Sequence, residues 1–174
     1  DLFLETARTA SDYYIDGYSA KDGVPYWDSA ALDTHRLGDF TAVDADPFNA
    51  HEPVDSSAAA IAAQGFLRLG QYLAGQGQAA AGRRYLQAGL TIADTLFAEP
   101  YLSTAPRHQG LLLHSVYHRP NGWDYIAPGQ KVPNGESSMW GDYHLRELAL
   151  MLLRETRGEP YLTFFGAVPK ARAS

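Results

Sequence analysis

The chain has 174 residues, of which 45% are hydrophobic and 12% aromatic, and its formal net charge is -6. This composition is typical of one folded globular domain and excludes a disordered chain. The sequence has no cluster of Lys and Arg, so nucleic acid is not expected as a partner. It contains no cysteine, which excludes disulfides, thiolate nucleophiles and cysteine-based zinc sites.

The first expected helix covers residues 2–15, where apolar residues recur at helical spacing as Phe3, Ala7, Ala10 and Tyr14. The amphipathic pattern begins at once, without a basic segment followed by an apolar one. We therefore expect that the chain starts in the middle of a fold and that residues upstream are missing. No apolar run approaches the roughly 20 residues that cross a bilayer, so no membrane partner is expected.

A long loop is expected from Tyr18 to Val54, because Gly, Pro and Asp recur every few positions. Loops of this length inside a compact domain are usually functional. The aromatic island VPYW, residues 24–27, should pack against the rest of the domain. Asp28 follows it and is expected to fix the loop.

The middle of the chain predicts an antiparallel helical hairpin. Asp55, Ser56 and Ser57 form a cluster of N-cap residues before an alanine-rich helix that ends near residues 75–77. The second helix covers residues 79–97. Its expected buried stripe is Tyr85, Leu86, Leu90, Ala93, Leu96 and Phe97.

The segment 99–136 is expected to be mostly loop, although LLLHSVYH at 111–118 has the composition of a short strand or a buried extended piece. A further helix is expected over 137–156, ending at Arg157 and Gly158. In the tail, residues 161–174, only the first part is expected to be ordered. An all-α domain follows from these elements.

Four blocks stand in a characteristic order: DGVPYWDSAA (22–31), PVDSSAAAIAAQGFLRL (53–69), LLLHSVYHRPNG (111–122) and NGESSMWGDYHLRELALMLL (134–153). Together they resemble glycoside hydrolase family 88, the unsaturated glucuronyl hydrolases. They resemble the unsaturated rhamnogalacturonyl hydrolases of family 105 more distantly. The resemblance implies an all-α toroid of six helical hairpins, an (α/α)6 ring. This chain, 1–174, would be a single domain that forms about the C-terminal half of the ring.

The resemblance also implies a reaction. Such enzymes act on the 4,5-unsaturated uronic acid that a polysaccharide lyase leaves at the non-reducing end of an oligosaccharide. They hydrate the enol ether at C4=C5, with an aspartic acid as the proton donor. The family's catalytic aspartates lie upstream of the helix that begins this chain. The catalytic residues are therefore unknown here, the chain alone is expected to be inactive, and a missing N-terminal half is the expected protein partner. The family implies no cofactor and no metal.

The segment Gly135, Ser137, Ser138 and Trp140 runs into a helix N-terminus, where backbone N–H groups and hydroxyls can hold a carboxylate or a sulfate. These residues are our first candidates for binding the uronate. The alternative is that one serine is an ordinary N-cap and that Trp140 is a packing residue. Asp142, inside the helix, could carry a buried hydrogen bond.

Two further candidates for binding sugar are Trp27, through stacking, and His118, through the pocket wall. His114 and His118 could in principle bind a metal, but no carboxylate has a matching spacing, so packing and loop hydrogen bonds are expected instead. Asp55 is expected to be an N-cap whose pKa is lowered by backbone N–H groups, which would make it a poor proton donor.

Two other hypotheses about the function of the chain remain open. The chain could be a non-enzymatic helical interaction module, or a fragment that folds without activity. The sequence does not identify the lyase product or the oligomeric state. It leaves the compartment open, with the cytoplasm expected for a bacterial protein and secretion as the alternative.

Overall fold

The computed structural model describes residues 2–160 and 162 of the chain. In this part the regular secondary structure is helical, and the only β pairing consists of isolated bridges. The long helices are α1 (Leu2–Tyr13), α2 (Ser56–Gly75), α3 (Ala79–Leu96) and α4 (Met139–Thr156). The all-α prediction is confirmed.

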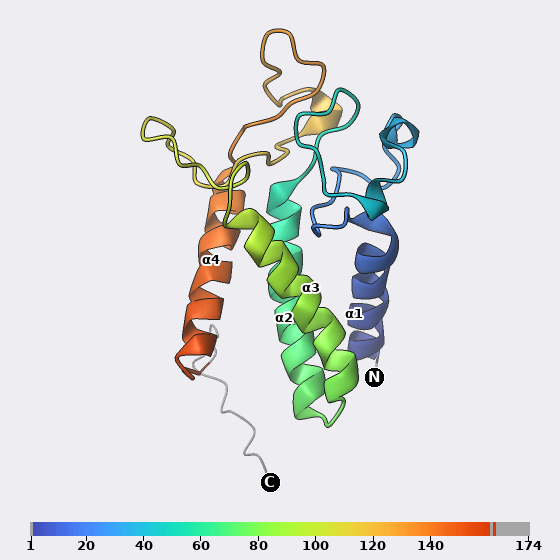
Figure 1. Ribbon diagram of the computed structural model, residues 1–174, viewed down its shortest axis with the longest axis vertical. Helices are drawn as coiled ribbons and strands as arrows, with labels where there is room; N and C mark the ends of the chain where they lie inside the picture. Colours follow the sequence, from blue (N-terminus) through green and yellow to red (C-terminus); the bar gives the residue numbers. More distant parts are fainter. Residues whose placement is uncertain (1, 161, 163–174) are drawn as a thin grey trace.

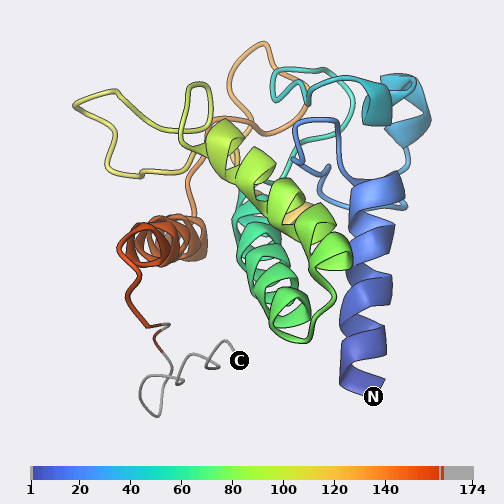
Figure 2. The same cartoon turned by 60° about the horizontal axis from the view of Figure 1, so that its bottom comes forward.

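Helices α2 and α3 form the expected antiparallel hairpin, with α1 and α4 on either side of it (Figures 1 and 2). The approach of α2 to α3 is close because glycines lie at the contact. A Cβ built on Gly82 would lie 2.5 Å from the carbonyl oxygen of Gly70, and one on Gly89 would lie 2.9 Å from that of Ala63. The hairpin therefore depends on small residues in both helices.

Helix α1 lies beside the hairpin but buries none of its residues. Polar contacts join this region to α3. The guanidinium of Arg84 forms ion pairs with Asp12 of α1 at 3.3 Å and, in the helical turn Tyr14–Tyr18 that follows α1, with Asp16 at 2.7 Å. The Tyr85 hydroxyl also donates to Asp12 at 2.9 Å. Phe3, which belonged to the predicted stripe, is 85% exposed.

The predicted stripe of α3 is correct at most positions and wrong at two. Tyr85, Ala93 and Leu96 are buried and Leu86 is half-buried, whereas Leu90 and Phe97 are exposed. The neighbours of α3 among the described helices lie mainly on its α2 side, so a side chain pointing away from that side remains in contact with water.

The long loops gather at one end of the helices, and the short turn between α2 and α3 lies at the other (Figure 1). This follows from chain direction, since α1 and α3 end where α2 and α4 begin. The first loop packs down as predicted, with Val24 and Tyr26 buried. In the second loop, Leu112, His114 and Ser115 are buried, but the extended piece makes only one bridge, between Leu102 and Leu112. Except for residue 162, the tail predicted for 161–174 lies outside the described residues.

Candidate functional site

An aromatic cluster lies at the loop end of the molecule, beside the start of α4. The rings of Tyr117 and Trp140 stack with centroids 5.3 Å apart and planes at 26°. Trp123 continues the cluster at 6.0 Å from Tyr117, and the His118 ring lies 4.9 Å from Trp123. We call these four residues the aromatic platform. Tyr117 and Trp123 are more than half exposed, so the platform presents ring surface to solvent.

The platform is held from below by the first turn of α2. The indole N–H of Trp140 donates to the Ser57 hydroxyl oxygen at 3.2 Å, and the Ser57 hydroxyl donates to Asp55 Oδ1 at 2.6 Å. Asp55 also caps α2, accepting from the backbone N–H groups of Ser57 and Ala58. A line of hydrogen bonds thus joins the start of α2 to the ring of Trp140.

The N-cap prediction for Asp55 is confirmed, but the predicted direction of its pKa is wrong. Burial raises the pKa of Asp55 above its ordinary value, because desolvation of the carboxylate outweighs the hydrogen bonds from Ser57, Ala58 and Val116. Its Oδ1 already accepts four hydrogen bonds. The residue is therefore built into the support of the platform.

The serines before α4 have different surroundings. Ser138 is the N-cap, and its hydroxyl oxygen accepts from the Gly141 N–H at 3.0 Å. The Ser137 hydroxyl is buried and has no hydrogen-bond partner among the described residues. Gly110 lies against it, with no room for a side chain. Ser137 therefore offers a donor that the fold itself does not use.

Gly135 does not offer a free N–H. Its backbone N–H donates to Nδ1 of His114 at 2.9 Å. His114 is buried and its backbone has a left-handed φ of 65°. Its ring packs edge-on against the rings of Phe48 and Tyr101. Desolvation lowers the pKa of His114 to about 4, so its ring is neutral at pH 7 and serves as a hydrogen-bond acceptor inside the loop. His114 and His118 accordingly have separate roles.

Two carboxylates fix the second loop beneath the platform. Asp142 accepts from the backbone N–H groups of Leu111 and Leu112, each at 2.8 Å. It therefore has the hydrogen-bonding role that was predicted for it. Asp124 accepts from the N–H groups of Tyr117 and His118. These bonds fix the backbone of Tyr117 and His118, and so the positions from which their side chains extend.

Trp27 lies on the first loop and is not part of the platform. Its indole N–H donates to Glu52 at 2.7 Å, and the other oxygen of Glu52 accepts from the Asp33 N–H at 2.8 Å. Glu52 is buried, so this carboxylate ties the end of the loop to residues 27 and 33 within it. Asp28 fixes the loop as predicted, by accepting from the Ala30 N–H at 2.8 Å.

The sequence analysis missed Tyr117, Trp123 and Ser57 as site residues. Tyr117 and Trp123 stand in or beside the quoted block HSVYHRPNG, where their aromatic character was the available signal. Ser57 looked like one of several cap residues, and no sequence pattern indicates a bond across more than 80 residues to Trp140.

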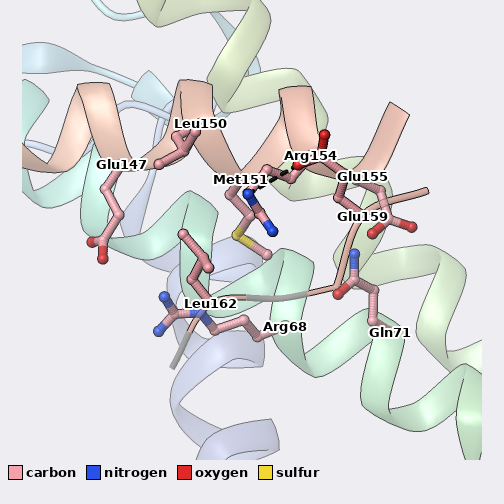
Figure 3. Close-up of a pocket in the computed structure, with 9 residues that line it drawn as sticks. All are labelled: Arg68, Gln71, Glu147, Leu150, Met151, Arg154, Glu155, Glu159 and Leu162. Carbon is pink, nitrogen blue, oxygen red and sulfur yellow. Dashed lines mark ion pairs between the residues drawn. The ribbon is translucent and has the colours of Figure 1, made fainter. Parts of the chain in front are cut away.

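A separate cavity of about 90 Å³ lies between the C-terminal parts of α2 and α4, away from the platform (Figure 3). Arg154 lies within it, pairing with Glu159 at 2.9 Å and donating to the Pro160 carbonyl. These bonds fold the end of α4 back on itself. Elsewhere in the described residues, no group of three or more His, Asp or Glu is arranged to hold a metal. None of the described helices is long and apolar enough to span a bilayer.

Comparison with solved structures identifies proteins of the same fold. An unsaturated glucuronyl hydrolase specific for heparin is 22% identical and matches 90% of this chain with a TM-score of 0.62. The unsaturated glucuronyl hydrolase responsible for the degradation of glycosaminoglycan from Bacillus sp. GL1 is 26% identical over 89% of the chain, with a TM-score of 0.60. The resemblance to unsaturated glucuronyl hydrolases is confirmed. A third structure of this kind, an Asp-to-Asn variant with dGlcA-Glc-Rha-Glc, is 27% identical, with a TM-score of 0.59.

The chain spans about a third of the length of these unsaturated glucuronyl hydrolases, 33–34% of each. It therefore has the fold of part of their helical toroid. The sequence matches no protein-family model and no curated protein sequence, so the similarity rests on the three-dimensional arrangement.

Proposed function

We propose that this chain supplies part of the substrate site of an unsaturated glucuronyl hydrolase. The substrate class is an oligosaccharide with a 4,5-unsaturated uronic acid at its non-reducing end. In the proposed reaction, a proton adds to C4 and water adds to C5 of the enol ether. The resulting hemiketal opens and releases the remaining sugar.

The observation that carries this proposal is the exposed stack of Tyr117 and Trp140 next to the capped start of α4. Sugar and cofactor sites combine ring surface with a few fixed polar groups. Here the ring surface is the platform, and the polar group is the buried, unpartnered hydroxyl of Ser137. A uronate carboxylate at this position would also be favoured by the positive end of the α4 dipole.

The proposed roles follow from which donors are still available. Tyr117 and Trp140 stack against the sugar ring, and Ser137 donates to the carboxylate. The Ser138 hydroxyl already accepts from Gly141, but its proton remains available. Gly135 positions the loop, because its N–H is used by His114. His118 supports Trp123, and Trp27 offers a half-buried ring to the part of the sugar that faces the first loop.

The proton donor is proposed to lie outside this chain, in the part of the toroid that the chain does not include. Exposed apolar side chains on α1 and α4 support a covering partner of this kind. They include Leu2 and Phe3 on α1 and Met139 and Leu150 on α4. Further helical hairpins would bury these side chains.

The test uses an unsaturated chondroitin disaccharide and follows the ultraviolet absorbance of its enol ether. We expect a form of the protein extended upstream of Asp1 to remove this absorbance, and the chain 1–174 to leave it unchanged but to bind the disaccharide. Tyr117→Ala and Trp140→Ala should each weaken that binding. If neither form consumes any of several lyase products, the proposal fails. Selective turnover of a rhamnogalacturonan product would instead indicate the family 105 reaction.

A further inference from the structure

A second cavity, of about 140 Å³, lies on the first loop, between the end of α1 and the segment 26–40. Its walls include the aromatic rings of Tyr18, Tyr26 and Phe40, and its polar lining groups belong to Asp28, Ser29 and Thr34. Since one water occupies about 30 Å³ in the liquid, the cavity is large enough for several waters or one small ring. The proposed function does not use it.

One polar atom among the residues that line this cavity has no partner. The Thr34 Oγ1 is buried and forms no hydrogen bond with any described residue. A buried hydroxyl without a partner is uncommon, because it loses its hydrogen bonds to water on burial and gains none in the fold. A ligand hydroxyl in the cavity would supply the missing bond.

The aromatic walls are held in place without a ligand. The Tyr18 hydroxyl donates to the Tyr26 carbonyl at 2.8 Å, and the Phe40 ring packs edge-on against the Tyr26 ring at 5.4 Å. Burial, followed by the charges of Asp55 and Asp28, raises the pKa of Tyr18 to about 12, so this phenol keeps its proton at neutral pH. The loop itself is closed by Glu52, which bonds both Trp27 and Asp33. The cavity is therefore preformed.

The charge of the lining selects the class of ligand. Asp28 is the charged residue among the lining residues, and no Lys or Arg is among them. A uronate or a sulfate would meet a carboxylate there without a compensating cation. Ring faces together with hydroxyl and carboxylate acceptors suit a neutral polyhydroxylated ring.

We infer that this cavity is a binding site for a neutral sugar ring, separate from the aromatic platform. The ring would lie against Phe40 and Tyr18, with one hydroxyl bonded to Thr34 and another donating to Asp28. The inference goes beyond the proposed function, because none of its contacts involves Tyr117 or Trp140. It adds a place for an uncharged unit of an oligosaccharide.

The experiment is ligand-observed NMR on the chain 1–174, with D-glucose and L-rhamnose as neutral probes and D-glucuronate as the charged one. Thr34→Val removes the hydroxyl and keeps the shape, so the fold should be preserved. Phe40→Ala removes one wall, with circular dichroism checking that the helices remain. Trp140→Ala is the matched control, since it alters the platform and leaves the cavity intact.

We expect at least one neutral probe to bind in the millimolar range. In Trp140→Ala, where the platform no longer adds a uronate site, D-glucuronate should bind at least tenfold more weakly than that probe. Thr34→Val should weaken neutral binding about fivefold, the effect of one hydrogen bond. Trp140→Ala should bind the neutral probe as the unmodified chain does. The inference is overturned if no neutral probe binds, if Thr34→Val and a folded Phe40→Ala bind it unchanged, or if Trp140→Ala abolishes its binding. These results are independent of whether the enol ether is consumed, so failure here leaves the proposed function standing.

Discussion

The indole of Trp140 and the hydroxyl of Ser57 are joined by a hydrogen bond of 3.2 Å between residues 83 positions apart. Trp140 belongs to the first turn of α4 and Ser57 to the first turn of α2. Because Ser57 is itself bonded to Asp55 at 2.6 Å, the orientation of the platform depends on how α2 begins.

Ser57→Ala should release the Trp140 ring. The substitution leaves the indole N–H without its partner and removes one bond to Asp55. We expect a loss of about 1–2 kcal/mol in the free energy of unfolding, together with a shift in tryptophan fluorescence emission. Urea denaturation and emission spectra measure both. Thr9→Ala, which removes a hydroxyl from an exposed position on α1, is the control and should change neither quantity. An unchanged spectrum for Ser57→Ala would contradict the arrangement.

Asp55 should make the chain less stable as the pH rises through its titration. Its pKa is raised above the ordinary value of 3.8, so the native state holds the proton more tightly than the unfolded state. Stability gained from this group is therefore present at low pH and is lost as pH rises through the folded pKa. Asp55→Asn keeps an acceptor at the cap without the charge. As the pH rises from 4 to neutral, the free energy of unfolding of Asp55→Asn should therefore increase relative to that of the unmodified chain.

A difference that stays constant with pH, or moves toward the unmodified chain, would show that the carboxylate is not desolvated. Asp55→Ala separates charge from capping, because it removes both. Relative to Asp55→Asn, which does not titrate at this position either, it should cost about 1 kcal/mol at every pH through the lost cap.

His114 should have the opposite effect to Asp55, lowering the stability of the chain as the pH falls. Its pKa falls from 6.5 to about 4 on burial, so the unfolded state binds the proton more readily. Stability should drop as the pH is lowered from 6.5 to 4, by up to about 3 kcal/mol in all. His114→Asn should remove this dependence. Asparagine tolerates the left-handed backbone and can accept from Gly135.

Denaturation curves at several pH values would measure the effect of His114. Because the two proteins are identical at every other position, the contributions of all other groups cancel in the comparison. The same acid sensitivity in His114→Asn and in the unmodified chain would rule out the assignment to this ring.

Gly82→Ala should strongly destabilise the α2–α3 hairpin. The added Cβ would lie 2.5 Å from the Gly70 carbonyl oxygen, so the helices would have to separate, at a cost of about 1–3 kcal/mol. Gly65→Ala is the matched control in α2, where nothing lies within 4 Å of the new carbon. It should stabilise the chain by about 0.5–1 kcal/mol, because alanine favours a helix interior. Thermal unfolding compares the two, and equal effects would contradict the close approach.

Much of the helical framework could be predicted from local patterns. The N-cap at Asp55, the glycines near residue 75 and the apolar spacing of residues 79–97 indicate where helices begin and end. Those signals are local because capping and periodicity act within one or two turns. Burial was less predictable: Leu90 and Phe3 fit helical stripes, but both side chains are largely exposed to water.

The candidate site could be predicted only in part. Trp140 and the serines before α4 were predicted as candidates from their position at a helix start, and His118 from its place in the segment HSVYH. Tyr117 joins them because Asp142 holds the second loop against α4, and such a long-range bond leaves no periodic signal in the sequence.

The sequence by itself determined the helical class, the hairpin of α2 and α3, the absence of cysteine chemistry and the resemblance to unsaturated glucuronyl hydrolases. Only the tertiary structure decided which aromatic rings meet, that Ser57 supports Trp140, and that the pKa of Asp55 is raised. The physical reason is that stacking and desolvation depend on how segments far apart in the chain come together, whereas helix formation depends on near neighbours.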